Sequence, residues 1–120
     1  MSKFGKSRNR SVLKQGGYCY YCQQPMWSAD PDTFASRYDI SVNQARLLQA
    51  TAEHLIAQCD GGSNDDTNIV AACKFCNTKR HHARPARSPS AHLRRVRTRL
   101  ASGKWHGLRL HSVDTRVPSI

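Results

Sequence analysis

The sequence of 120 residues has no apolar run near the ~20 residues that a membrane-spanning helix needs. Its beginning, MSKFGKSRNRSVLK, also lacks the apolar core of a secretory signal. Acidic residues are scarce, with 8 Asp and Glu against 19 Lys and Arg, and the formal charge is +11. Internal repeats are absent. These absences argue against membrane proteins, secreted scaffolds and fibrous repeats, and they predict a cytoplasmic protein with one small domain.

Charge is unevenly distributed along the chain. Residues 1–28 hold five basic residues and no acid, residues 29–72 hold two basic and seven acidic residues, and residues 73–120 hold twelve basic residues and one acid. The basic ends predict a polyanionic partner, with nucleic acid as the leading candidate. Arg outnumbers Lys by thirteen to six, which favours forked contacts with phosphate. No segment resembles a helix-turn-helix or tandem zinc fingers, so no base-reading element is predicted.

The five cysteines are an odd number in a chain without an export signal, which argues against a disulfide framework. Cys19-x-x-Cys22 and Cys73-x-x-Cys76 instead have the number and spacing of a closed tetrahedral Zn²⁺ site. A redox pair or independent thiols are the alternative, but a redox CxxC would not need a second pair. A structural Zn²⁺ contributes ~10 kcal/mol or more to folding, which a chain with few apolar residues needs. Cys59 is left over and is predicted to be a small buried hydrophobe.

The chain divides into three predicted parts: a flexible basic arm at 1–11, a zinc-containing domain at 12–87 with an insertion at 26–49, and a basic helix and tail at 88–120. Caps, turn residues and periodicity predict the following elements: helices ending near Tyr38 and spanning 42–49, strands at 50–57 and 68–72, and helices at 73–83 and 88–102. The two strands and the helix after them form a ββα unit.

Four short segments carry a resemblance to a known family: Ala52-Glu-His-Leu-Ile56, Gly61-Gly62-Ser63-Asn64, Thr67-Asn-Ile-Val70 and Cys76-Asn-Thr-Lys-Arg-His81. In this order, over roughly residues 16–82, the sequence resembles the HNH family of ββα-metal (His-Me finger) endonucleases, in particular small stand-alone phage and bacterial members with a four-Cys zinc site. The resemblance implies an α+β fold with a structural zinc knuckle pair and, here, an extra C-terminal helix. It also implies metal-dependent hydrolysis of DNA that leaves 5′-phosphate and 3′-hydroxyl ends.

The resemblance gives each matched residue a role. His54 is the general base that activates water, and Asn68 holds the loop and orients the His54 imidazole. Glu53 and Asn77 bind a catalytic divalent cation such as Mg²⁺, Mn²⁺ or Ni²⁺, and His81, one helical turn after Asn77, is a candidate further ligand. The family often has Asp or His where this chain has Glu53, which leaves the metal preference open. A His with an ordinary pKa of ~6.5 is suited to take a proton from water near neutral pH.

Basic residues on the last two predicted helices are the expected contacts to the phosphates of double-stranded DNA: Lys79, Arg80, His82, Arg94, Arg95, Arg97 and Arg99. For each of them a solvated surface position is the alternative. Three other functions stay open at this point: a zinc module that binds nucleic acid without cutting it, an RNase with the same site, and a nuclease that works only within a larger DNA-processing complex. The sequence leaves the oligomeric state and the cleavage specificity open.

Overall fold

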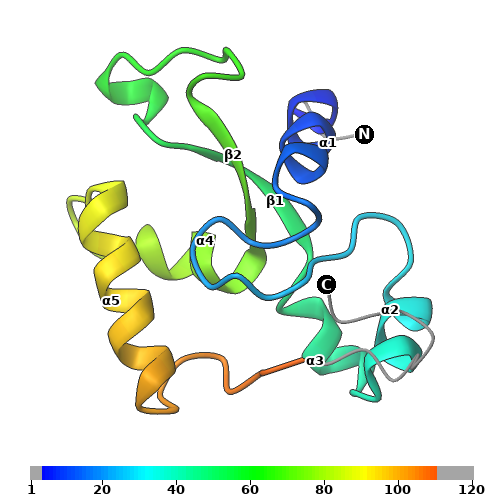
Figure 1. Cartoon of the computed structure of the whole chain (residues 1–120). Coiled ribbons are helices and arrows are strands. Elements are labelled where there is room, and N and C mark those ends of the chain that lie inside the picture. The colour runs from blue at the N-terminus through cyan, green and yellow to red at the C-terminus, as the bar shows by residue number, and fades with distance from the viewer. Residues whose placement is uncertain (1–3, 111–120) are drawn as a thin grey trace.

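The structure is a computed structural model that describes residues 4–110. Its elements, shown in Figure 1, are α1 (Gly5–Lys14), α2 (Pro31–Tyr38), α3 (Val42–Arg46), β1 (Ala50–His54), the 3₁₀ turn η1 (Gln58–Asp60), β2 (Ile69–Cys73), α4 (Lys74–Arg80) and α5 (Pro89–Ala101). This arrangement confirms the predicted small α+β fold, in which β1, β2 and α4 form the ββα unit. Within the described part, no helix is long and apolar enough to cross a membrane.

The two strands form an antiparallel hairpin in which Ala50 pairs with Cys73 and His54 pairs with Ile69. The first strand is shorter than the predicted 50–57. It ends at His54, because the residues that follow form hydrogen bonds to Asn68 instead of extending the strand. Leu55 N donates to Asn68 O at 2.8 Å, and Ile56 N donates to the Asn68 side-chain oxygen at the same distance. Glu53 and His54, the expected cation ligand and the expected general base, therefore lie where the strand ends and the loop begins.

Polar side chains start the helices as the sequence predicts. Ser41 and Gln44 form a reciprocal capping box at α3, and Ser88 caps α5, which has Pro in its first turn. The helix expected at 42–49 is shorter, however, and ends at Arg46. It stops there because the carbonyl of Leu47 accepts a hydrogen bond from the backbone of α4 at 3.0 Å instead of continuing the helical ladder.

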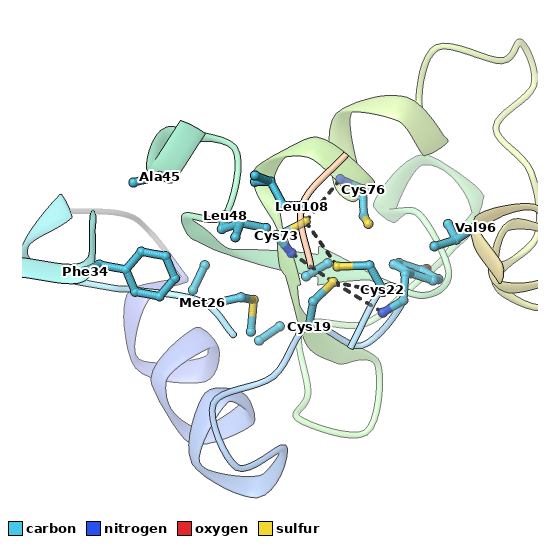
Figure 2. Packing of buried hydrophobic residues seen from close by; sticks show 14 of the residues in the cluster. Cys19, Cys22, Met26, Phe34, Ala45, Leu48, Cys73, Cys76, Val96 and Leu108 are labelled. Atoms are coloured by element: carbon cyan, nitrogen blue, oxygen red, sulfur yellow. Dashed lines mark hydrogen bonds between the residues drawn. The ribbon is translucent and has the colours of Figure 1, made fainter. Parts of the chain in front are cut away.

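The hydrophobic core surrounds the four cysteines. Figure 2 shows Met26 and Phe34 on one side of the thiols and Val96 of α5 on the other. Leu48 and Leu108 complete the cluster, and both are buried. The thiol cluster thus lies at the point where the insertion, the hairpin and α5 meet, so an ion bound by the thiols would be part of the core.

The prediction of a flexible arm at 1–11 is wrong where the structure describes it, because α1 begins at Gly5. Arg10 forms a bidentate ion pair with the Asp66 carboxylate, at 2.6 and 2.9 Å, and the Ser11 hydroxyl donates to Ile69 O at 3.0 Å. These partners are 56 and 58 residues away in the chain. In Figure 1, α1 packs beside the hairpin for this reason.

Three smaller expectations need correction or lie partly beyond the described residues. Cys59 is exposed in η1 rather than buried, since the loop that carries it projects from the hairpin (Figure 1). The helix predicted at 73–83 ends at Arg80. The tail at the end of the predicted 88–120 segment is described only as far as Leu110, whose backbone N donates to Gln24 Oε1 at 2.7 Å. Residues 111–120 lie outside the described residues.

Candidate active site and metal centre

All four cysteines of the two CxxC pairs are buried, and their sulfur atoms lie within 4.8 Å of one another. Backbone N–H groups point at the sulfurs: Tyr21 N and Cys73 N each lie 3.3 Å from Cys19 Sγ. None of these cysteines is in a disulfide. Four convergent thiols with N–H donors around them are the donor set of a structural zinc site, so the residues fit the ion that the spacing predicts.

The four thiols affect one another's ionisation. The hydrogen-bonding contact with Cys19 lowers the pKa of Cys22, because it stabilises the Cys22 thiolate, whereas contact with Cys19 raises the pKa of Cys73 and Cys76, because one ionised thiol disfavours ionisation of its neighbours. A divalent cation removes this conflict by taking every sulfur as thiolate. Trp105 Nε1 donates to Cys76 Sγ at 3.2 Å, so the segment after α5 also supports the cluster.

Glu53 is the centre of a second polar cluster, at the buried face of β1. Its carboxylate is 2% exposed and faces different partners with its two oxygens. Oε1 lies 3.1 Å from Nε2 of His81, whereas Oε2 lies 3.1 Å from the Arg80 guanidinium and 3.4 Å from the Tyr21 hydroxyl. Two of the expected cation ligands, Glu53 and His81, are thus brought together.

Tyr21 and Arg80 fix the carboxylate from the inner side. Burial, together with the negative charge of Glu53, raises the pKa of Tyr21, so its hydroxyl stays protonated and donates to the carboxylate. Arg80 also donates to the backbone carbonyls of His54 and Leu55, at 3.0 and 2.9 Å. The oxygen toward His81 remains the one that faces the surface, since the His81 side chain is 44% exposed.

His54 is held by residues outside β1. Its Nε2 lies 3.0 Å from Asn64 Oδ1, and the same oxygen accepts a hydrogen bond from Gln58 Nε2 at 2.8 Å. The Phe4 ring packs edge-on against the imidazole with 4.8 Å between centroids. Asn64 and Phe4 therefore fix the orientation of the expected general base.

Asn68 holds the loop between the strands. Its side chain binds both the N–H and the carbonyl of Ile56, and Nδ2 also donates to Ser63 O at 2.8 Å. Gly62 passes so close to Ile56 O that a Cβ atom at this position would overlap it. The loop-holding role expected for Asn68 fits these bonds, while the side-chain contact to His54 comes from Asn64.

Comparison with protein families matches residues 39–83 to the model described as HNH endonuclease. These residues form an HNH domain. The match contains β1, the loop, β2 and α4, and it leaves Cys19, Cys22 and α5 outside. No curated protein and no solved structure matches the chain. The cysteine cluster therefore joins the HNH domain to the segment before it.

Within the HNH domain, Asn77 lies one turn before His81 on α4. Its Nδ2 donates to Thr51 Oγ1 at 3.0 Å and to Ala52 O at 3.4 Å, so the side chain lies against β1. These hydrogen bonds hold the Asn77 amide on the hairpin. The carboxylate–imidazole pair is made by Glu53 and His81.

The expected DNA contacts separate into two groups. Arg80 is 4% exposed and paired with Glu53, so its assignment as a phosphate contact is wrong: it is a buried structural residue of the HNH domain. Arg99 is half-buried and donates to Lys104 O at 3.1 Å. The other expected contacts lie at the surface, exposed or, for Lys79, partly exposed: Lys79, His82, Arg94, Arg95 and Arg97.

Sequence reasoning did not identify Tyr21 and Asn64 as residues of the site. It also missed the structural role of Arg80. Asn64 stands in the Gly-Gly-Ser-Asn segment, which could have pointed to a loop residue near His54. Tyr21 stands between Cys19 and Cys22, where an aromatic residue is equally consistent with simple packing. No local pattern identifies Arg80 as buried, because its partner Glu53 lies 27 positions earlier.

Proposed function

We propose that this protein is a metal-dependent DNA endonuclease that uses His54 as the general base. The observation that carries the proposal is the pairing of Glu53 Oε1 with His81 Nε2 at 3.1 Å, next to His54 on the same strand end of an HNH domain. A buried carboxylate and a surface imidazole at this distance offer one oxygen and one nitrogen ligand. Most of the coordination shell is left for water and phosphate.

The ligand set also bears on which cation fits. A carboxylate and an amide alone would favour a hard ion such as Mg²⁺, whereas the His81 nitrogen favours Mn²⁺, Ni²⁺ or Zn²⁺. Glu53 has one oxygen held by Arg80 and Tyr21, so it would bind a cation through the other. Such outer partners orient a ligand and tune its charge.

The hydrogen bond of His54 supports its proposed role as the base. Asn64 Oδ1 can only accept, so Nε2 of His54 donates to it and Nδ1 carries the free lone pair. Nδ1 then takes a proton from the attacking water, the water oxygen forms a bond to phosphorus, and the bond to the 3′ oxygen breaks, with solvent protonating that oxygen. A bound divalent cation supplies positive charge for the phosphate and the leaving oxygen. The Phe4 ring, which packs against the imidazole at close to a right angle, restricts its rotation.

Double-stranded DNA is the proposed substrate because cationic side chains at the surface flank the site on α4 and α5. The proposal is for a protein that acts in the cytoplasm, on its own or within a larger DNA-processing complex. A structural zinc ion held by the four cysteines would fix the HNH domain against the segment that carries Tyr21, and hence fix Glu53.

Plasmid cleavage tests this function. We expect supercoiled DNA to be nicked or cut with Mn²⁺, Ni²⁺ or Mg²⁺, and we expect His54→Ala to lose a factor of about 10²–10⁴ in rate, which is the usual contribution of general-base catalysis. Thr78→Ala, on the exposed face of α4, is the matched control. Equal cleavage by His54→Ala and the wild type would contradict the mechanism. Parallel digestion of RNA and binding without cleavage would identify the RNase and the non-catalytic zinc module.

A further inference from the structure

A basic hollow is formed where α4 and the loop after it meet α5 and the segment that follows α5. It has a volume of about 240 Å³, and it is lined by Lys79, His82, Ala83, Arg87, Arg95 and Trp105. These residues come from α4, the loop before α5, α5 itself and the segment after it. Four of them carry or can carry positive charge. Arg87 is not among the phosphate contacts that the sequence predicts.

The cations of this hollow have no carboxylate partner among residues 4–110. The ion pairs of that part of the chain are Arg10 with Asp66 and Arg80 and His81 with Glu53. Moreover, residues 73–110 contain no Asp or Glu. Like charges that converge on one concave site repel one another, and the arrangement is favourable only when an anion neutralises them.

The hollow is built rather than formed by loose side chains. Trp105 Nε1 is anchored on Cys76 Sγ at 3.2 Å, and the Trp105 ring packs edge-on against Phe75. Lys79 Nζ lies 5.3 Å from the centre of the Phe75 ring, which restricts this side chain as well. One wall of the hollow is therefore attached to the cysteine cluster.

Arg80 links the hollow to the candidate active site. Its Nε donates to the carbonyl of Arg87 at 2.8 Å, and its Nη1 lies 3.1 Å from Glu53 Oε2. A single buried guanidinium therefore fixes the rim of the hollow relative to the carboxylate. His81, which faces Glu53, also stands between two residues of the hollow in the chain, Lys79 before it and His82 directly after it.

We infer that this hollow binds a phosphate group of the nucleic-acid strand next to the phosphate that is cut. The inference rests on the proposed function for the identity of the strand. Arg87 and Arg95 supply forked donors that suit phosphate oxygens, and Lys79 adds a point charge. Because Arg80 contacts both the Arg87 carbonyl and Glu53, a phosphate bound here would have a fixed position relative to Glu53. It would align the strand before the cleavage step.

Binding without cleavage tests the inference. In a His54→Ala background, the double variant Arg87→Gln and Arg95→Gln is compared with Arg37→Gln and Arg46→Gln, which removes the same charge from α2 and α3. Fluorescence anisotropy with a labelled DNA duplex measures the Kd at several salt concentrations. We expect the first variant to bind about tenfold more weakly or worse, with a salt slope smaller by about 0.9 for the one phosphate lost. We expect the control to keep the wild-type slope.

Duplexes with and without a 5′-phosphate separate an internal phosphate from a terminal one. Equal affinity for both indicates an internal phosphate, whereas a preference for the phosphorylated end that the double variant loses indicates a terminal phosphate. Either result supports the hollow as a phosphate site. Equal weakening in both double variants, wild-type binding by the first, or no DNA binding at all would overturn it.

Both double variants should fold, since Arg95 is exposed and Arg87 contributes only its backbone carbonyl to the bond with Arg80. Circular dichroism and zinc content check this. Because the assay does not require cleavage, the two proposals fail separately. A protein that binds DNA through the hollow yet cuts no DNA would refute the nuclease and leave the phosphate site in place.

Discussion

Removal of the Arg80 guanidinium should destabilise the contact between α4 and the hairpin, and with it the folded protein. Arg80 and Glu53 are 4% and 2% exposed, and Arg80 donates to three carbonyls in addition to the carboxylate. Loss of one partner from a buried ion pair leaves the other charge unpaired, which costs about 3–5 kcal/mol. We therefore expect Arg80→Met to lower the free energy of unfolding by that amount.

The same loss can be expressed as a melting temperature. For a domain of this size, 1 kcal/mol corresponds to about 3–5 °C, so a loss of about 3–5 kcal/mol should lower Tm by about 9–25 °C. Urea denaturation of the zinc-loaded protein, followed by circular dichroism, gives the free energy directly. Arg94→Met is the matched control, because Arg94 is exposed on α5 and should change stability by at most about 0.5 kcal/mol.

A double-mutant cycle shows whether the buried charge is the cause. Glu53→Gln alone leaves Arg80 charged and buried, and Arg80→Met alone leaves Glu53 charged. The double variant leaves neither, so it should lose less stability than the sum of the two single variants. A loss below about 1 kcal/mol for Arg80→Met, or strict additivity in the cycle, would refute a buried ion pair of the kind described.

The remaining predictions concern the metal centre and the base. Cys76→Ser, or a strong chelator, should abolish the cooperative melting transition, because zinc binding is folding free energy; an unchanged melting curve after chelation would contradict this. Asn64→Leu should slow plasmid cleavage by about tenfold or more while the melting temperature stays within a few degrees, because it frees the His54 ring without opening the core. Asn64→Asp, which keeps an acceptor, should cleave faster than Asn64→Leu, and equal rates for the two would contradict a role in orienting His54.

Local patterns predicted the parts of the fold that depend on local chemistry. The two CxxC pairs identified the thiols that the structure gathers within 4.8 Å, and the capping residues Ser41 and Ser88 marked the starts of α3 and α5. The turn residues at 60–66 separated the two strands correctly. Such features have their cause within a few residues of the chain, which is why the sequence alone reveals them.

Features that depend on distant partners were missed. The segment 1–11 reads as a solvated basic arm because the residues that order α1, namely Asp66 and Ile69, lie more than fifty positions away. Arg80 on α4 reads as a phosphate contact because its neighbours Lys79 and His81 are polar and its counter-charge, Glu53, lies on β1. In both cases a basic residue was assigned to an external anion when the fold itself supplies one.

These two errors change the meaning of the net charge of +11. Glu53 and Asp66 are among the seven acids of the middle segment, and both form ion pairs with arginines from outside it. Of the arginines thus paired, Arg80 is buried, whereas Arg10 stays at the surface with a carboxylate partner. The basic residues that remain without a carboxylate lie mainly in 73–110, and four of them converge on the hollow next to the HNH site. The buried pair of Arg80 with Glu53 therefore joins α4 to the hairpin, whereas the cations without a carboxylate are the ones that the proposed function assigns to a phosphate strand.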